Sequence, residues 1–237
     1  MSYEHVRNSV IGTTIAEIAT LPICTLKTNY QNTNSNSITA TAKSMYKTNG
    51  IKSFYVASVP AILSQVFSTS TKYTLYKFLE NKNYQYTNKI TNGIFSGIVS
   101  SLMTHPIDSI KIHTQMRTPF LPELRKHGMY LFYRGYSKTF SKVVVGSALF
   151  FPLYDTYRNI FNGNALLASV ASGFTSTLIM HPIDYLKTRH IYGQKLYAGW
   201  NPIIYYKGLT LNLLRIVPHF TIVMISIDYL EKKWDNK

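Results

Sequence analysis

The sequence predicts an all-α membrane protein, a bundle in which a helix, a short connection and a second helix occur three times. Three observations predict this architecture. A segment with a proline, an acid and a lysine recurs along the 237 residues, an apolar segment follows each copy, and charged residues make up only 15% of the chain. Soluble domains average roughly 25% charged residues.

The predicted helices should surround a polar cavity. The chain has no continuous run of about eighteen apolar residues, so no segment meets the simple criterion for a helix that lies wholly in lipid. A helix that borders a water-filled cavity needs an apolar stripe only on its lipid side, because its polar residues face inward. Spanning helices of mixed polarity are therefore expected.

The net charge and the motif inventory limit the function classes. A formal charge of +15 points to nucleic acid, an anionic lipid or an anionic substrate. In a nucleic-acid-binding protein the bases would cluster on one face or in a known module, whereas here they are scattered. Cys24 is the only cysteine, which excludes disulfides within the chain and cysteine-based zinc sites. Without a Gly-rich phosphate loop or nucleophile motif, we expect no enzyme activity, cofactor or metal.

The recurring segment is seven residues long and occurs at Leu21–Lys27, His105–Lys111 and His181–Lys187. The second and third copies contain the pattern P-x-D-x-x-K, whereas the first has Cys24 in place of the acid. A proline inside a helix removes a backbone hydrogen bond and kinks the helix. An acid and a base three residues apart share a helix face. Each copy thus predicts a kinked helix with charges on one side.

The flanks of the three copies also match. Small residues four apart precede each proline and would let helices approach closely: Ser9 and Thr13, Gly93 and Gly97, Ser169 and Gly173. Further on, the triplets Tyr133-Arg134-Gly135 and Tyr206-Lys207-Gly208 correspond to a degraded Tyr55-Val56-Ala57. Apolar segments follow at about 57–81, 135–160 and 208–233. The repeats therefore cover about 1–82, 83–161 and 162–237.

Together these motifs resemble the signature of the mitochondrial carrier family, P-x-[DE]-x-x-[KR] followed by an aromatic-basic-Gly triplet, and the resemblance covers essentially the whole chain. It implies one transmembrane carrier domain over residues 1–237, with six transmembrane helices in three pseudo-threefold repeats and a short matrix-side helix in each. It also implies a monomer that exchanges small metabolites across the mitochondrial inner membrane by alternating access, without enzyme activity.

The resemblance implies a matrix gate of ion pairs between neighbouring proline helices. By the family's pairing order, Asp108 should meet Lys187 and Asp184 should meet Lys27. Because Cys24 replaces the third acid, Lys111 is expected to lack a partner. Gln31 and Gln115, nine residues past the first two prolines, resemble the family's braces, which are amides that hydrogen-bond an ion pair.

A second, cytosolic gate is implied by the motif [FY]-[DE]-x-x-[KR], which Tyr154–Arg158 matches with Asp155 and Arg158. The other two copies depart from this motif. The copy in the last apolar segment has Asp228 and then Glu231 in place of the base, and the copy in the first has Lys77 and Glu80, with both signs reversed. Family pairing would join Arg158 with Asp228 and Lys77 with Glu231. If the second helix is shifted by three residues, Thr74 and Lys77 occupy the motif and Lys77 meets Asp155 instead. Both registers stay open.

The triplets also have a lipid interpretation. In the family they help to bind cardiolipin, whose phosphates sit at helix N-termini, so Arg134, Gly135, Lys207 and Gly208 are candidate contacts for cardiolipin or another anionic lipid. The alternative is an ordinary helix start with a solvated base.

Substrate contacts in the family lie midway along the even-numbered helices, seven and eight residues past the triplet glycine. The corresponding residues are Arg215, Lys142 and Val143, Ser64 and Gln65, with Lys138 one turn from Lys142. A base at bilayer depth is costly unless it faces water or an anion. The alternative is a cavity base paired with an internal acid such as Glu17.

Two bases across a cavity favour a substrate with several negative charges, and phosphates are the natural match because Arg binds them bidentately and Lys as a point charge. Val143 would offer an apolar surface to a nucleobase. The resemblance therefore favours a carrier of nucleotides or deoxynucleotides. A strict ADP/ATP exchanger is disfavoured, because the run R-R-R-M-M-M is absent and Gly146 replaces an aromatic residue. Carriers of phosphate, carboxylates or amino acids are alternatives.

Overall fold

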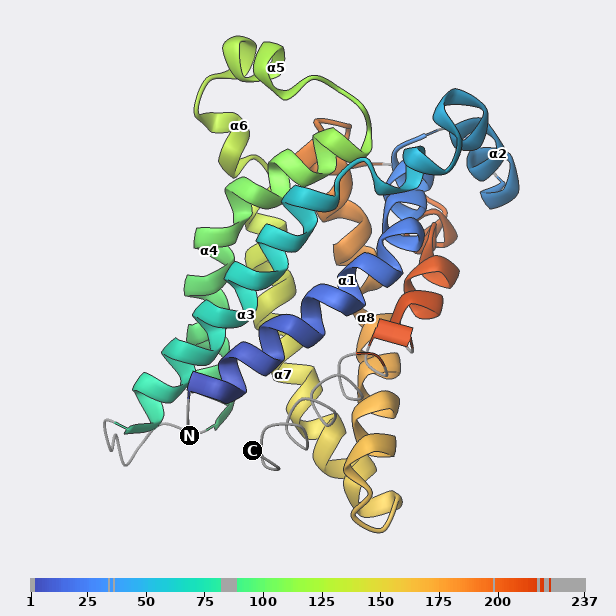
Figure 1. The fold of residues 1–237 in the computed structure, drawn as a ribbon. Helices are drawn as coiled ribbons and strands as arrows, with labels where there is room; N and C mark the ends of the chain where they lie inside the picture. Colours follow the sequence, from blue (N-terminus) through green and yellow to red (C-terminus); the bar gives the residue numbers. More distant parts are fainter. Residues whose placement is uncertain are drawn as a thin grey trace.

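The computed structural model describes residues 3–33, 35, 37–81, 89–197, 199–216, 218–219 and 222, and no strand occurs in them. The long helices lie side by side in a bundle, with the shorter elements α2, α5 and α6 at the end opposite the N-terminus (Figure 1). The long helices are α1 (Tyr3–Asn32), α3 (Ser58–Asn81), α4 (Lys89–Gln115), α7 (Tyr136–Ile160) and α8 (Ala165–Tyr192). A further helical segment occupies residues 209–216 and is called the final helix below.

The short elements lie in the connections between the long helices. The first connection contains α2 (Ile38–Asn49) and the 3₁₀-helix η1 (Gly50–Tyr55), and the second contains α5 (Phe120–His127) and α6 (Tyr130–Tyr133). In the third, only the 3₁₀-helix η2 (Pro202–Tyr206) forms among the described residues. The short helix expected in that repeat is thus a 3₁₀-helix, and no α-helix precedes it in the described residues 193–197 and 199–201. Gly193 and Gly199, with φ of +86° and +131°, place left-handed backbone in this connection and interrupt a helix there.

The prolines of the recurring segment lie inside helices, as the sequence predicts. Pro22 is within α1, Pro106 within α4 and Pro182 within α8. These three helices contact one another in every pairing. The charged residues that follow the prolines are thus brought together at the centre of the bundle.

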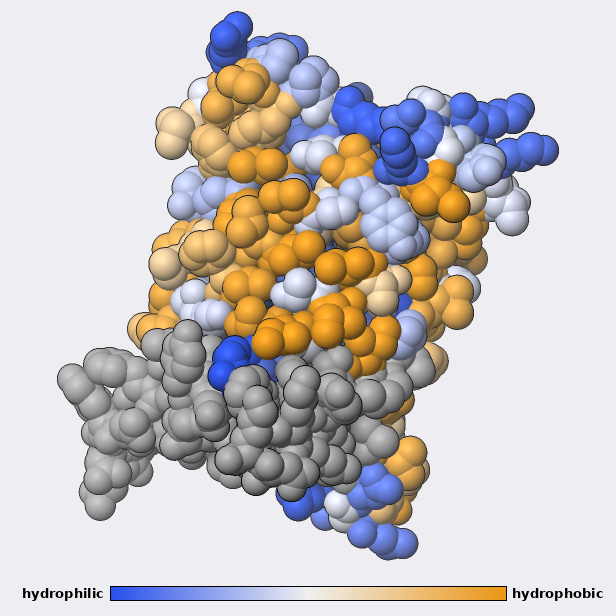
Figure 2. Space-filling view, in the orientation of Figure 1, coloured by the Kyte–Doolittle hydropathy of each residue, from blue (hydrophilic) through white to orange (hydrophobic). Residues whose placement is uncertain are grey.

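The distribution of polar and hydrophobic side chains is the reverse of that in a soluble protein, because polar side chains are buried in the bundle and hydrophobic ones are exposed. On α1, the buried face includes Thr13, Glu17 and Thr20, whereas Ile11, Ile15 and Ile18 are exposed. Hydrophobic residues cover the middle of the visible face, and hydrophilic residues gather at the end that contains α2 and α5 (Figure 2). By length and hydropathy, one described segment, Val10–Asn32, qualifies as a membrane span.

Small residues bring α4 and α7 into close contact. A Cβ atom added to Gly97 would lie 2.7 Å from Cγ1 of Val143, which is closer than van der Waals contact allows. The sequence prediction that small residues permit close helix approach is confirmed at this position. Gly97 and Val143 also line a cavity between the helices, which is described below.

Basic side chains join each connection to the end of a neighbouring long helix. Arg134 donates two hydrogen bonds, of 3.0 and 2.7 Å, to the carbonyl oxygen of Ile191 near the end of α8. Lys207 donates to the carbonyl oxygen of Thr33, just past α1, at 2.6 Å. These bonds satisfy carbonyl groups that a helix leaves free at its C-terminus.

The first repeat makes the equivalent link in the opposite direction. Val56 stands at the basic position of its triplet and cannot donate such a bond. Instead Arg117, two residues past the end of α4, donates from Nη2 to the hydroxyl oxygen of Ser53 in η1 at 2.5 Å. The link between the connection and the next helix is therefore present in all three repeats, although the basic residue comes from the other side in one of them.

We expect Arg117→Met to lower the free energy of unfolding by about 1 to 2 kcal/mol, because it removes one charged hydrogen bond at a partly buried site. Thermal unfolding of the purified protein in detergent measures this loss. Arg125→Met, at an exposed position of α5, is the matched control and should unfold like the wild type. Equal melting temperatures for both variants would contradict the proposed link.

Candidate functional site

A central cavity of about 900 Å³ lies between the long helices. All five long α-helices and the final helix contribute to its wall. Its charged lining residues are Lys27, Asp108, Lys111, Lys142, Asp184, Lys187 and Arg215. Small polar residues, among them Ser64, Ser68, Ser96 and Thr104, form much of the remaining wall.

Five of the six residues predicted as substrate contacts line this cavity: Ser64, Gln65, Lys142, Val143 and Arg215. Lys138 is described but is not among the lining residues, and its charge acts instead on His190 near the end of α8. The expectation that Lys138 joins Lys142 in the site is therefore not met. Lys138 lies one helical turn before Lys142, in the first turn of α7.

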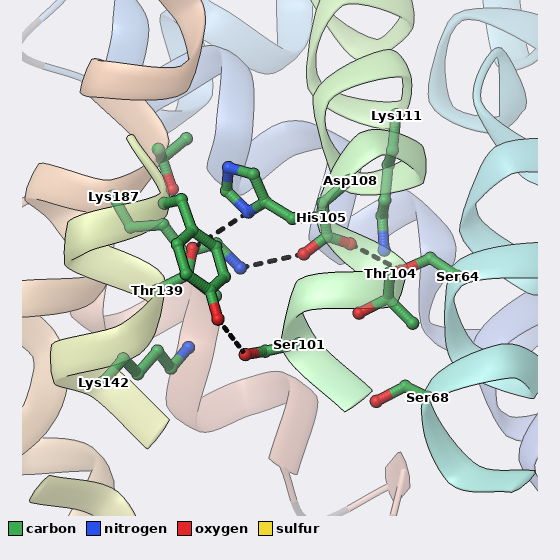
Figure 3. Close-up of polar contacts among 12 residues, drawn as sticks. Ser64, Ser68, Ser101, Thr104, His105, Asp108, Lys111, Thr139, Lys142 and Lys187 are labelled. Atoms are coloured by element: carbon green, nitrogen blue, oxygen red, sulfur yellow. Dashed lines mark hydrogen bonds and ion pairs between the residues drawn. The ribbon is translucent and has the colours of Figure 1, made fainter. Parts of the chain in front are cut away.

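The predicted pair Asp108–Lys187 is present. The Lys187 amine lies 2.9 Å from Oδ2 of Asp108, and the Ser64 hydroxyl donates to Oδ1 of the same carboxylate at 2.5 Å (Figure 3). Both oxygens of this acid are thus engaged, by α8 on one side and by α3 on the other. The contact joins three helices from three different repeats.

The second predicted pair, Lys27–Asp184, is also present, but Asp184 holds two bases. Its Oδ2 accepts from Lys27 and its Oδ1 accepts from Lys142. Lys27 additionally donates to Oδ1 of Asn212 at 2.9 Å. Lys142 is therefore a paired base, which is the alternative that the sequence left open, although Asp184 and not Glu17 is its partner.

Glu17 supplies the acid that the first repeat lacks at position 24. Its Oε1 accepts from Lys111 at 3.0 Å and its Oε2 accepts from Arg215. The expectation that Lys111 has no partner is wrong. Glu17 precedes Cys24 by seven residues, or two helical turns, so both side chains lie on the same face of α1.

Motif comparison missed this role of Glu17 because it examined only the position equivalent to the other acids. A signal was available, since Glu17 is a single acid within an otherwise uncharged stretch between Arg7 and Lys27. Its side chain is fully buried, at 0% exposure. A buried carboxylate needs charged or hydrogen-bonding partners, so its presence alone predicts neighbouring bases.

The two glutamines do not brace ion pairs as expected. Gln31 donates from Nε2 to the carbonyl oxygen of Lys207 at 3.2 Å, and Nε2 of Gln115 lies 3.7 Å from the sulfur of Cys24. The reason at Gln115 is direct: the acid that it would brace is replaced by the thiol. Nη1 of Arg215 also lies 3.5 Å from that sulfur, so position 24 stays next to a cation.

The predicted lipid contacts have internal roles for their side chains. Arg134 and Lys207 are bonded to the backbone of Ile191 and Thr33, as described above, so neither base is a free solvated side chain. Gly135 and Gly208 adopt φ of +82° and +87° where the next helix begins. The role of these positions in lipid binding stays a prediction.

The predicted cytosolic gate falls largely outside the described residues. Asp228 and Glu231 lie outside them, and so do the side chains of Lys77 and Glu80, whose backbone belongs to α3. Asp155 and Arg158 are exposed on α7 and line a shallow second pocket. The pairing of these residues and the register of α3 stay predictions.

The charges around the central cavity do not balance. The five bases Lys27, Lys111, Lys142, Lys187 and Arg215 are held by three acids, Asp108, Asp184 and Glu17. Among the described residues, the cluster therefore has a surplus of two positive charges around the cavity. All five bases except Lys142, whose side chain is 40% exposed, are largely buried, and buried charge is costly unless it is paired. An anion in the cavity would complete the balance.

We expect Cys24→Asp to raise the melting temperature by about 2 to 4 °C, which corresponds to about 1 kcal/mol in a protein of this size. The new carboxylate would face Arg215 and Lys111, which in the wild type share a single acid, Glu17. Cys24→Ser, which changes the polar atom without adding charge, is the control and should melt like the wild type. A Cys24→Asp protein that is no more stable than the serine variant would contradict the prediction.

Comparison with known proteins places the chain in a family. Residues 2–85 and 82–165 match the family model for mitochondrial carrier proteins. A mitochondrial carrier-like protein of Acanthamoeba polyphaga mimivirus is 58% identical over 231 residues, which cover 98% of this chain and 97% of that protein.

Two more distant relatives are named for their substrates. The mitochondrial thiamine pyrophosphate carrier 1 of Kluyveromyces lactis is 23% identical over 91% of this chain and 86% of its own. The mitochondrial electrogenic aspartate/glutamate antiporter of Homo sapiens is 22% identical over 98% of this chain and 41% of its own. Given the family match and the 58% identical relative, the chain belongs to the mitochondrial carrier family, whose members are transporters.

Proposed function

We propose that this carrier exchanges small anions with several negative charges, nucleotides or deoxynucleotides in particular, across the mitochondrial inner membrane. The observation that supports this proposal is the surplus of two positive charges around a cavity of about 900 Å³. A cavity of this size can hold a nucleotide, since typical ligand pockets measure about 300 to 1,000 Å³.

The positions of the cavity bases favour phosphate groups. Lys142 on α7 and Arg215 on the final helix line the same cavity, and each shares its acid with a second base. A guanidinium binds phosphate oxygens bidentately, and an ammonium binds them as a point charge. Val143, next to Lys142, adds an apolar surface for a nucleobase. A relative named for thiamine pyrophosphate agrees with a substrate that contains a diphosphate group.

The membrane arrangement belongs to the same proposal. We assign six transmembrane helices, three pseudo-threefold repeats at about 1–82, 83–161 and 162–237, and a multi-pass monomer that binds cardiolipin or another anionic lipid near Gly135 and Gly208. The outward position of residues such as Ile15, Phe95 and Leu167 supports contact with lipid. The ion pairs of Asp108 and Asp184 act as the matrix gate, because they join the proline helices and can break and reform between two states.

Uptake into proteoliposomes tests this function. The purified protein is reconstituted with internal nucleotide and offered labelled nucleotides, deoxynucleotides, phosphate, dicarboxylates and amino acids. We expect exchange of nucleotides or deoxynucleotides. Exchange restricted to carboxylates or amino acids would show that the proposed substrate is wrong. Absence of exchange for every compound would refute the proposed transport function.

We expect Lys142→Ala and Arg215→Ala each to reduce exchange by at least about tenfold, which is the effect of losing one charged contact with the substrate. Lys138→Ala removes the same charge one turn from Lys142, where it does not line the cavity, and should exchange at close to the wild-type rate. Thermal unfolding confirms that each variant is folded. Normal exchange in a folded Lys142 or Arg215 variant would remove that residue from the site.

A further inference from the structure

The carboxylate of Glu17 holds bases from two other helices at once. Oε1 accepts from Lys111 of α4, and Oε2 accepts from Arg215 of the final helix. His219 and Cys24 are the other titratable groups that act on this acid. We propose that Glu17 is a resident counter-ion, a carboxylate that an anionic group of the substrate displaces from Arg215 when the substrate binds. This inference rests on the proposed function.

Arg215 has donors to spare for an incoming anion. A guanidinium offers five N–H donors in a planar fork. In the structure its strong acceptor is Glu17, whereas its other contacts are the Thr20 hydroxyl and the Cys24 sulfur, both at 3.5 Å. The thiol is a weak acceptor, and both contacts are long. A phosphate or carboxylate in the cavity would therefore form stronger bonds with Arg215 than these two contacts, and it would compete with Glu17 for the guanidinium.

Displacement does not leave Glu17 buried without a partner. An unpaired carboxylate at 0% exposure would be strongly unfavourable, but Lys111 remains bonded to Oε1 when Arg215 turns to the substrate. After displacement, Glu17 and Lys111 thus form a one-to-one ion pair. The same substrate anion neutralises the positive charge that Arg215 would otherwise have alone.

Asp184 repeats this arrangement in a second cluster that lines the same cavity. It holds Lys142, which we place in the substrate site, and Lys27, which belongs to the matrix gate. In both clusters, one acid is shared between a cavity base and a second base from another helix. Binding of a doubly charged anion to Lys142 and Arg215 would leave the pairs Lys27–Asp184 and Lys111–Glu17 intact.

The position of Glu17 explains why it competes with substrate. An acid at position 24 would lie with the residues of the predicted matrix gate, whereas Glu17 lies two helical turns, or about 10 Å, further toward the N-terminus of α1. Glu17 bonds the guanidinium of Arg215 directly, whereas position 24 contacts it only through the Cys24 thiol. The carboxylate consequently lowers the affinity for the substrate anion and, by returning to Arg215, promotes its release.

Binding of inorganic pyrophosphate to the purified full-length protein tests the inference. The dissociation constant is obtained from the rise in melting temperature with pyrophosphate concentration, since a ligand that binds only the folded state stabilises it. We expect Glu17→Gln to bind pyrophosphate about tenfold more tightly than the wild type, because a competing charged contact is lost. In exchange assays with the transported anion, both KM and kcat should fall, because release is slower.

The matched control is Glu123→Gln, which makes the same substitution at a half-exposed acid of α5, where Glu123 contacts His127. It should bind pyrophosphate like the wild type. If Glu17→Gln does not fold, the comparison is made between Lys111→Met and Glu17→Gln/Lys111→Met, because removing both partners avoids an unpaired buried lysine. The double variant should then bind pyrophosphate more tightly than the single one.

Pyrophosphate binding in the Glu17→Gln protein that is equal to or weaker than in the wild type would overturn the inference. This outcome together with normal nucleotide exchange by the wild type would leave the proposed function intact. Tighter pyrophosphate binding in the variant, together with a wild-type protein that exchanges none of the tested anions, would instead support the counter-ion role and refute the proposed function.

Discussion

Two buried carboxylates, each bonded to two bases, hold the centre of this bundle together. Asp184 joins Lys27 of α1 with Lys142 of α7, and Glu17 joins Lys111 of α4 with Arg215 of the final helix. Burying these charges is tolerated only because each has a partner within contact distance. The relative positions of the helices that supply them are therefore constrained, and so is the shape of the cavity that they line.

The same constraint gives the cavity its charge. Among the described residues, three acids cannot neutralise five bases, and the surplus lies in the two clusters that contain Lys142 and Arg215. The one-to-one pair Asp108–Lys187 adds no net charge to the cavity.

Much of this arrangement follows from the sequence, because the recurring segment determines helix, kink and charged face together. It predicts the helices around Pro22, Pro106 and Pro182, and the resemblance to the carrier family adds the pairs Asp108–Lys187 and Asp184–Lys27. The role of Glu17 does not follow, since a repeat comparison examines equivalent positions and Glu17 is seven residues away from one. The absence of a short α-helix after α8 among the described residues also could not be predicted from the repeat alone. It depends on the backbone conformations that Gly193 and Gly199 adopt in this one connection.

The divergence of the first repeat is compensated by residues elsewhere. Where Cys24 replaces an acid, Glu17 provides the carboxylate, and where Val56 replaces a base, Arg117 provides the bond from the opposite side. Both substitutions preserve a contact between neighbouring repeats while they change the residue that makes it. The first also places the negative charge two helical turns from position 24, where Glu17 bonds the cavity base Arg215, so its consequence extends from packing to the proposed substrate site.

The most direct measurement of this account is a double-mutant cycle between Glu17 and Lys111. The free energies of unfolding are measured for the wild type, Glu17→Gln, Lys111→Gln and the double variant. If Glu17 replaces the missing acid, the two substitutions interact, and the double variant is more stable than the sum of the single losses implies by about 1 to 3 kcal/mol. Additive losses would contradict the account, because they would mean that Lys111 and Glu17 do not form a pair.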